Sequence, residues 1–181
     1  TLKRVLRGPQ TAKRDIQCGS TPHRVHVRDI PVPASQDLAA LPVTARATVA
    51  DEWIDTMGHM NVMWYTHVFS NANLGFYSQL GMDNDYFNIH NAGIFALESH
   101  VLYRTEATKG TRLVVRSRVI ARSTKRVHVL HLLTLDADQT LCAMCEYILA
   151  HADLSARRMS NFPRQIATRI DAMIQTHNKL P

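Results

Sequence analysis

Residues 51–80 read DEWIDTMGHMNVMWYTHVFSNANLGFYSQL and set a polar, turn-prone loop directly before an apolar helix. From Asn61 to Leu80 the apolar residues recur at steps of three and four, which is the spacing of one helix face. These residues are Tyr65, Val68, Phe69, Ala72, Phe76 and Leu80. Gly81 follows directly, and glycine commonly ends a helix. The stretch therefore predicts a buried helix behind a loop that carries an acid, Asp55.

Strand-like segments lie on both sides of this helix. Residues 43–54 are rich in β-forming residues, and four long runs of the same kind follow at about 93–105, 111–122, 125–136 and 140–152. The turn signals ATKG, RSTK and DADQ separate those four runs. In the second run one face carries Arg112, Arg116, Arg118 and Arg122, while the other face is apolar. This alternation predicts a sheet with one buried face and one wet face. A short helix is expected after Pro163.

The order of the elements decides the fold class. One strand, one long apolar helix and four long antiparallel strands follow one another, and a buried helix of this kind requires a sheet wrapped around it. We therefore expect an α+β hotdog fold, in which an antiparallel sheet of about five strands wraps a central helix. The edges and open face of such a sheet usually require a second copy of the chain. A homodimer, or a tetramer built from dimers, is the expected assembly.

Residues 1–42 differ from the rest of the chain because they are rich in proline and basic residues and show no sustained period. We expect an irregular extension over 1–42 and one hotdog domain over 43–181, long enough to bury a core without disulfides. No apolar run reaches the roughly 18 residues that span a bilayer. No pattern of a secretory signal is found either. These features predict a cytoplasmic protein with no membrane partner.

The three cysteines, Cys18, Cys142 and Cys145, are expected to be reduced thiols. Cys142 and Cys145 form a Cys-x-x-Cys pattern, but they lie in a predicted strand, where residues three apart point to opposite faces. Two small buried side chains are therefore expected rather than a redox or zinc site. The same geometry argues against a metal site at His128 and His131. No metal is predicted.

The net charge of +6 predicts attraction to anions. Nucleic acid is one candidate partner, but the basic residues are not concentrated on one helix with aromatic or zinc-finger context. A phosphorylated ligand is the other candidate. We expect no nucleic-acid partner.

The loop before the helix carries residues suited to acyl chemistry. Asn61 is a good N-cap, and the first backbone N–H groups of a helix lack intrahelical partners. Those of Asn61, Val62 and Met63 are candidates to hold a developing oxyanion. Asp55 would attack a carbonyl or activate a water, and Gly58 would allow a tight turn. In this interpretation His59 orients the acid, with a general base as the other possible role. The alternative is that Asp55 and Asn61 only cap and turn the chain, with His59 as packing.

The string Asp-x-x-Gly-His-x-Asn over 55–61 resembles the signature of hotdog thioesterases of the 4-hydroxybenzoyl-CoA thioesterase type. Similarity runs from about Val43 to Ile166, and the segments EWIDTMGHMN, ALESHVLYRTEATKG and RRMSNFP are most similar to the betainyl-CoA thioesterase branch. The resemblance implies hydrolysis of an acyl-CoA without a further cofactor, since CoA is part of the substrate. It places Asp55 as the catalytic carboxylate and the amide near Val62 at the oxyanion, and Tyr65 matches the tyrosine that often follows the motif.

Substrate contacts are expected from two further sets of residues. Glu98 falls in the middle of a predicted strand, on the face shared with Ala96, His100 and Leu102, and would face a quaternary ammonium beside Trp64 or another ring. A basic rim would meet the CoA phosphates; it comprises Arg116, Arg118, Arg122, Lys125 and Arg126. For Glu98 and for the rim the alternative is an ordinary solvated surface. For the whole protein the alternative is a non-catalytic module that binds acyl-CoA or only dimerises.

Overall fold

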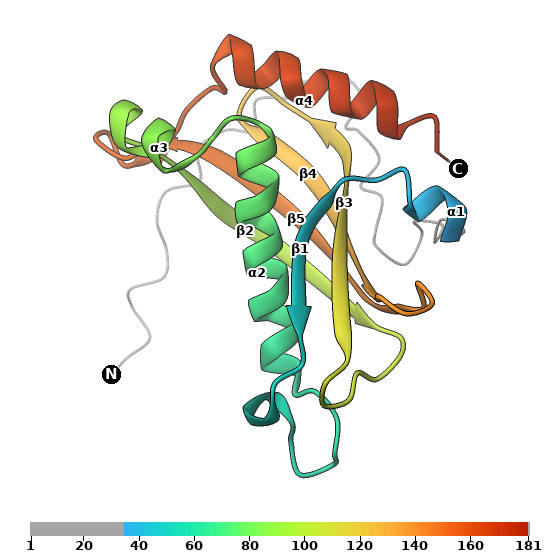
Figure 1. Cartoon of the computed structure of the whole chain (residues 1–181). Coiled ribbons are helices and arrows are strands. Elements are labelled where there is room, and N and C mark those ends of the chain that lie inside the picture. The colour runs from blue at the N-terminus through green and yellow to red at the C-terminus, as the bar shows by residue number, and fades with distance from the viewer. Residues whose placement is uncertain (1–34, 181) are drawn as a thin grey trace, which may run out of the picture.

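The computed structural model describes residues 35–180, in which one long helix lies in the curve of a single sheet (Figure 1). The helices are α1 (Ser35–Leu38), α2 (Val62–Gln79), α3 (Asn84–His90) and α4 (Arg164–His177), with a 3₁₀ turn at Asp51–Trp53. The strands are β1 (Val43–Thr48), β2 (Ala92–Tyr103), β3 (Arg112–Arg122), β4 (Arg126–Leu135), β5 (Leu141–Asp153) and β6 (Arg158–Met159). None of the helices in this range is both long and apolar enough to cross a membrane.

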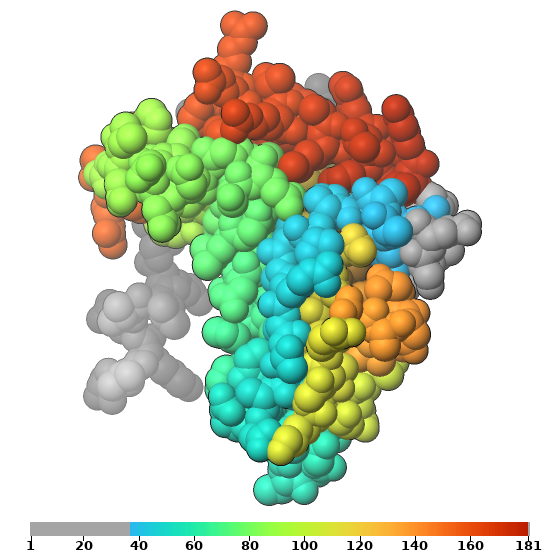
Figure 2. Space-filling model, viewed as in Figure 1, coloured from blue at the N-terminus to red at the C-terminus, as the bar shows by residue number. Residues whose placement is uncertain are grey.

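The sheet is antiparallel throughout, and its strands lie in the order β1-β3-β4-β5-β2, with β6 paired to β5. β1 lies beside α2 and β3, and α4 lies across one end of the sheet (Figure 2). The predicted α+β hotdog fold, with an antiparallel sheet of about five strands around one central helix and a closing helix, is confirmed. β2 is an edge strand of this sheet: within residues 35–180, no strand pairs with the other side of its backbone.

The predicted apolar stripe of α2 forms the centre of the core. Tyr65, Val68, Phe69, Ala72 and Phe76 are buried and pack with the inward-facing side chains of the sheet. Those side chains include Val115, Val119, Val129, Leu133, Cys145 and Leu149. Helical spacing alone therefore identified the side of α2 that packs against the sheet.

Gly75 lets the backbone of α2 approach β1 very closely. A Cβ atom built at Gly75 would overlap the carbonyl oxygen of Thr44 and contact its neighbouring backbone atoms. These are backbone atoms of a paired strand, so they cannot rotate away as the end of a side chain would. The contact fixes the position of α2 along β1.

Gly75→Ala tests this contact, because the helix propensity of alanine predicts the opposite result. In an exposed helix the change stabilises by about 1 kcal/mol. Here we expect a loss of about 1–3 kcal/mol in the free energy of unfolding, typical of overpacking. Chemical denaturation measures this, with Ser70→Ala on the exposed side of α2 as the control. A stability equal to or above that of the wild type would contradict the close approach.

A chain of buried polar groups joins α2 to the sheet. Thr44 Oγ1 lies 2.6 Å from Ser117 Oγ, which lies 2.6 Å from His131 Nδ1. His131 Nε2 lies 2.9 Å from the Asn73 Oδ1 atom on α2. His131 is fully buried, and desolvation lowers its pKa to about 3, so the ring is neutral in the folded protein. Because both ring nitrogens have partners, this polar group is satisfied inside an apolar core.

The neutral state of His131 predicts a specific pH dependence of stability. Between about pH 6.5 and pH 3 the unfolded chain binds a proton at this histidine that the folded chain does not, so stability falls as the pH falls. One such proton contributes a slope of about 1.4 kcal/mol per pH unit. In urea titrations below pH 6, His131→Gln should therefore show a shallower slope than the wild type. Parallel slopes for the two proteins would contradict a neutral buried His131.

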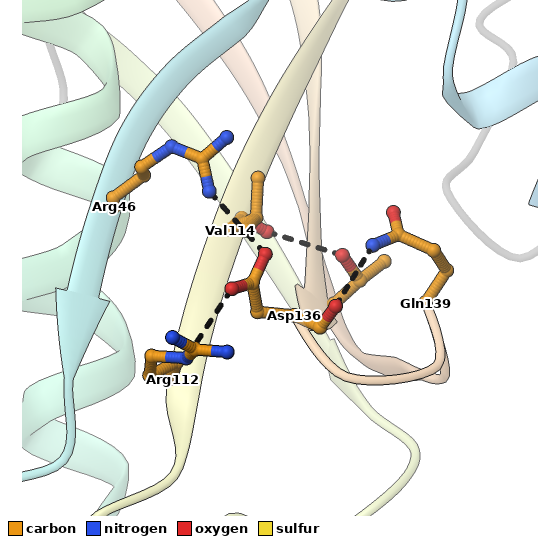
Figure 3. A network of polar contacts seen from close by, with 6 residues as sticks. Arg46, Arg112, Val114, Asp136 and Gln139 are labelled. Atoms are coloured by element: carbon orange, nitrogen blue, oxygen red, sulfur yellow. Dashed lines mark hydrogen bonds and ion pairs between the residues drawn. The ribbon is translucent and has the colours of Figure 1, made fainter.

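The outer face of the sheet, which points away from α2, is wet only in part, whereas a wet face was predicted. Arg46 and Arg112 are exposed on it and contact Asp136 (Figure 3), but its middle is covered. Leu38 and Leu41, from α1 and the turn after it, pack on Leu130, Leu132 and Met144 of this face. Leu180 also contacts this cluster. Part of the predicted irregular extension, residues 35–42, thus contains a short helix and covers the sheet; residues 1–34 lie outside the described range. The sequence pattern failed here because the covering residues are few and come from both ends of the chain.

Two irregularities in strand pairing change which side chains share a face. The β3–β4 register shifts between Val119 and Ala121, so Arg122 pairs with Val127 of the inner face, opposite to the prediction. The β2–β5 register shifts between Ala96 and Glu98, so those two residues do not share a face, again opposite to the prediction. A strict alternation of side chains holds only where no extra residue is inserted into a strand.

Helix α3, which follows Gly81, was not predicted from the sequence. The Asp83 side chain caps this helix by accepting a hydrogen bond from the Tyr86 N–H at 2.9 Å.

Cys142 and Cys145 are free and buried, as predicted. Burial raises the pKa of Cys142 to about 11 and that of Cys145 to about 12, so both remain protonated thiols at neutral pH.

Candidate active site

Backbone hydrogen bonds close the loop of residues 54–61, which directly precedes α2. Ile54 and Met60 form an antiparallel bridge, and the Asn61 N–H donates to the Trp53 carbonyl oxygen at 2.9 Å. The Met60 N–H donates to Ala107 O at 2.8 Å, which ties the loop to the segment after β2. The loop is thus a closed turn whose two ends are fixed to the body of the domain.

Asp55 stands at the start of this closed loop and shapes it. Its Oδ1 accepts from the Met57 N–H at 2.8 Å, and its own N–H donates to His59 O at 3.0 Å. Gly58 has a φ of +88°, a backbone conformation that residues other than glycine rarely adopt. Its N–H donates to Asp55 O at 3.0 Å. The Asp55 side chain remains 17% exposed. One carboxylate oxygen is therefore fixed by the backbone while the side chain still reaches solvent.

His59 lies between two carboxylates. Its Nδ1 is 3.7 Å from Asp55 Oδ2, and its Nε2 is 3.9 Å from Glu106 Oε1. Both distances are too long for hydrogen bonds. Glu106 was not predicted as part of the site, because it falls in the polar segment after β2 and no pattern distinguishes it from an ordinary turn acid. His59 thus lies beside Asp55 without a hydrogen bond to it.

The N-terminus of α2 offers fewer free amides than the sequence predicted. Asn61 is the N-cap, and its Oδ1 accepts from the Met63 N–H at 3.0 Å. The Asn61 N–H is itself bonded to Trp53 O. Of the three backbone amides that were expected to bind the oxyanion, those of Asn61 and Met63 already have acceptors, so only that of Val62 is left for this role. Val62 opens the helix, and a first-turn N–H has no carbonyl one turn back to accept it.

Asn61→Ala tests the role of this cap. Loss of the side-chain acceptor should lower the free energy of unfolding by about 0.5–2 kcal/mol. It should also lower turnover, because the first turn of α2 would fray beside Asp55. Thermal melting and a steady-state assay measure the two effects on one preparation. If stability drops while turnover stays at the wild-type value, the start of α2 does not take part in the reaction.

Aromatic side chains surround the beginning of α2. The rings of Trp53 and Trp64 stack with centroids 4.8 Å apart and an interplanar angle of 10°, and His67 contacts both rings edge-on. Tyr65 is only 4% exposed and packs edge-on against Tyr103 at 5.1 Å. Desolvation raises the pKa of Tyr65. Trp64 thus lies at the partly exposed side of the helix start, whereas Tyr65 belongs to the core beneath it.

Glu98 is not brought together with these residues. It pairs with Ile148 on the outer face of the sheet, whereas α2 and the loop lie on the inner side. A carboxylate there does not face Trp64 within one protomer. The prediction placed both near one acyl group because sequence alone does not show the shift of register in β2.

The predicted basic rim is divided among different environments. Arg116 donates to Leu41 O at 2.9 Å, and Arg118 donates to Leu180 O at 3.1 Å. Arg122 pairs with Asp171 of α4 at 2.6 Å, which raises the pKa of Arg122 and lowers that of Asp171. Lys125 and Arg126 are exposed in the β3–β4 turn. Arg116, Arg118 and Arg122 therefore connect Leu41, Leu180 and α4 to the sheet. They do not form one basic surface with Lys125 and Arg126.

Comparison with known proteins adds independent information. The profile of the Thioesterase-like superfamily matches residues 49–170. A betainyl-CoA thioesterase from Pseudomonas aeruginosa is 30% identical over 138 residues, covering 76% of this chain and 87% of that relative. An L-carnitine dehydrogenase/betainyl-CoA thioesterase from Agrobacterium fabrum is 29% identical over 136 residues, or 75% of this chain and 28% of that longer protein.

Solved structures share the fold. A Staphylococcus aureus protein in complex with CoA superposes with a TM-score of 0.71 at 25% identity, covering 76% of this chain and 87% of that one. A 1,4-dihydroxy-2-naphthoyl-CoA thioesterase from Synechocystis superposes with a TM-score of 0.63 at 15% identity, covering 71% and 95% of the two chains. The second similarity concerns the fold alone.

Proposed function

Because the chain belongs to the Thioesterase-like superfamily, we propose that Asp55 and the N-terminus of α2 form its catalytic site. The reaction class is hydrolysis of an acyl-CoA thioester to a free acid and CoA, as the resemblance implied. The observation that carries the assignment of residues is the closed loop. It holds a partly exposed carboxylate directly before a helix start whose first amide, that of Val62, has no intrahelical partner.

In the proposed reaction Val62, Asp55 and His59 have separate roles. The thioester carbonyl oxygen accepts from the Val62 N–H, which lies at the positive end of the helix dipole and stabilises the oxyanion as it forms. Asp55 Oδ1 is bonded to Met57, so Oδ2 is the oxygen that turns to the substrate. His59, 3.7 Å from Oδ2, steadies the carboxylate.

Two routes lead from this arrangement to the same products. In one, Asp55 attacks the carbonyl carbon and the C–S bond breaks to release the thiolate; water then hydrolyses the resulting anhydride, which restores the carboxylate and supplies the proton for the thiolate. In the other, Asp55 takes a proton from water, the hydroxide attacks, the C–S bond breaks and the proton passes to the thiolate. Both consume one water, release one acid and one thiol, and require no cofactor.

Asp55→Asn is the direct test of this function. The amide oxygen of asparagine can still accept from Met57, so the loop should keep its shape while the charge is lost. We expect turnover on an acyl-CoA to fall by at least ~100-fold, the lower end for loss of a positioned acid or base. Thiol release measures it, with Asp51→Asn in the preceding 3₁₀ turn as the control. Binding of acyl-CoA by a wild-type protein that never hydrolyses it would instead favour the non-catalytic module.

We propose that the acyl group of the substrate is small and positively charged. The relative from Pseudomonas aeruginosa is named for a betainyl-CoA substrate, and betaine carries a quaternary ammonium. The Trp53–Trp64 pair beside Val62 offers aromatic ring faces to such a cation. A desolvated cation–π contact is worth about 2 kcal/mol. Glu98 is not part of this proposal because it lies on the other face of the sheet.

The assembly that fits the fold is a homodimer formed through β2. Its edge position leaves backbone groups for a second copy, and its exposed apolar side chains are Phe95, Leu97 and Tyr103. An isologous contact through one edge strand pairs it antiparallel with itself. A domain over 43–181 and a cytoplasmic location, which suits free cysteines, complete the proposal.

A further inference from the structure

Glu106 is a carboxylate beside the catalytic loop that the proposed reaction does not use. It follows the end of β2, and its side chain is 74% exposed. Its Oε1 lies 3.9 Å from His59 Nε2, whereas Asp55 Oδ2 lies 3.7 Å from the other ring nitrogen, Nδ1. Because one imidazole ring separates the two carboxylates, they are at most roughly 10 Å apart. Glu106 is therefore a neighbour of any substrate that reacts at Asp55.

The backbone on both sides of Glu106 is fixed. The next residue, Ala107, is buried, and its carbonyl oxygen accepts from the Met60 N–H at 2.8 Å. The residue before it, Thr105, donates its N–H to Cys142 O of β5 at 3.1 Å. The main chain at Glu106 is thus tied to the loop and to the sheet, while the exposed side chain can change rotamer.

The charge of Glu106 persists through the reaction, whereas that of Asp55 does not. Asp55 loses its negative charge in either route, when it forms the anhydride or when it takes a proton from water. A quaternary ammonium has no proton to lose, so a cationic acyl group keeps its charge at every step. Asp51, another acid at this end, already accepts from Lys109 Nζ at 2.6 Å. Glu106 is the unreacting carboxylate recorded beside the loop.

We propose that Glu106 is a specificity-determining residue, whose carboxylate selects a positively charged acyl group over a neutral group of the same shape. The proposal rests on the proposed function and adds to it the anion that recognises the substrate. It gives Glu106 the role that the sequence suggested for Glu98, which pairs with Ile148 on the outer face of the sheet. Glu106 acts on the substrate by its charge and takes no part in bond making or breaking.

The cation of such a substrate lies near both carboxylates. In a trimethylammonioacetyl thioester the nitrogen is two bonds from the carbonyl carbon, roughly 2.5 Å away. With the carbonyl carbon at about 3–3.5 Å from Asp55 Oδ2, the nitrogen lies within roughly 6 Å of that oxygen. A change of rotamer turns the Glu106 carboxylate toward this position. The Trp53–Trp64 rings also pack against a neutral group of the same shape, whereas a carboxylate distinguishes the two by charge.

The test compares two substrates that differ in one atom. Trimethylammonioacetyl-CoA and tert-butylacetyl-CoA have the same shape, but the quaternary nitrogen of the first is a carbon in the second. Glu106→Gln should lower the ratio of kcat/KM, cationic over neutral, by about 5-fold, which is about 1 kcal/mol between partly exposed charges. Glu106→Lys should lower the ratio by about 25-fold, because an attraction becomes a repulsion of similar size. Thiol release measures both ratios.

The matched control is Glu52→Gln. Glu52 is an exposed acid in the 3₁₀ turn at the same end of the domain, so this variant removes the same charge at another position. Its ratio of kcat/KM should stay at the wild-type value. Added salt should lower the wild-type ratio toward that of Glu106→Gln, since exposed charges are screened. Thermal melting should be the same for all these proteins, because exposed side chains contribute little to stability.

The outcomes separate this proposal from the proposed function. Wild-type protein that hydrolyses neither substrate nor any acyl-CoA of a chain-length series would overturn the function. Hydrolysis without preference for the cationic substrate would overturn the cationic acyl group and the role of Glu106 with it. A preference that both Glu106 variants retain would overturn the role of Glu106 alone. An equal loss on both substrates would also overturn it, because Glu106 would then act through His59 or Asp55.

Discussion

At Gly75 the backbone of α2 lies so close to β1 that even a methyl group would overlap the Thr44 carbonyl. Thr44 also begins the polar chain that reaches Asn73 of the same helix through Ser117 and His131. A steric contact and a set of directional hydrogen bonds therefore fix α2 at one place in the curve of the sheet. Apolar burial of Phe69 and Phe76 alone would tolerate a helix that slides or rotates.

In the proposed site, the fixed helix determines where the chemistry takes place. The start of α2 is fixed in space, and the loop before it closes through bonds to Trp53 and Ala107. Asp55 and Val62 are consequently held by the same short segment, one by its loop and the other by its helix. Preorganised donors and carboxylates of this kind cost little reorganisation when charge develops in a transition state. The catalytic proposal thus follows from how the helix is docked.

Much of this arrangement was predictable from local patterns. The three-and-four spacing of α2, the Gly81 stop and the turns between long strands depend on neighbours in sequence, and so do the Asn61 cap and the turn at Gly58. The partners of those groups were not predictable. The Glu106 carboxylate lies near His59, and the Asn61 N–H donates a hydrogen bond to Trp53 O. Only the folded chain creates these contacts. The shifts at Ile120 and Leu97 are equally invisible in the pattern, and they moved Arg122 and Glu98 to other faces.

The most direct measurement of the catalytic geometry is a crystal structure of the Asp55→Asn protein with an intact acyl-CoA. The account predicts that the thioester carbonyl oxygen accepts a hydrogen bond from the Val62 N–H, with the carbonyl carbon facing the side chain of residue 55. A thioester bound away from the start of α2, or with its carbonyl oxygen turned from Val62, would contradict it.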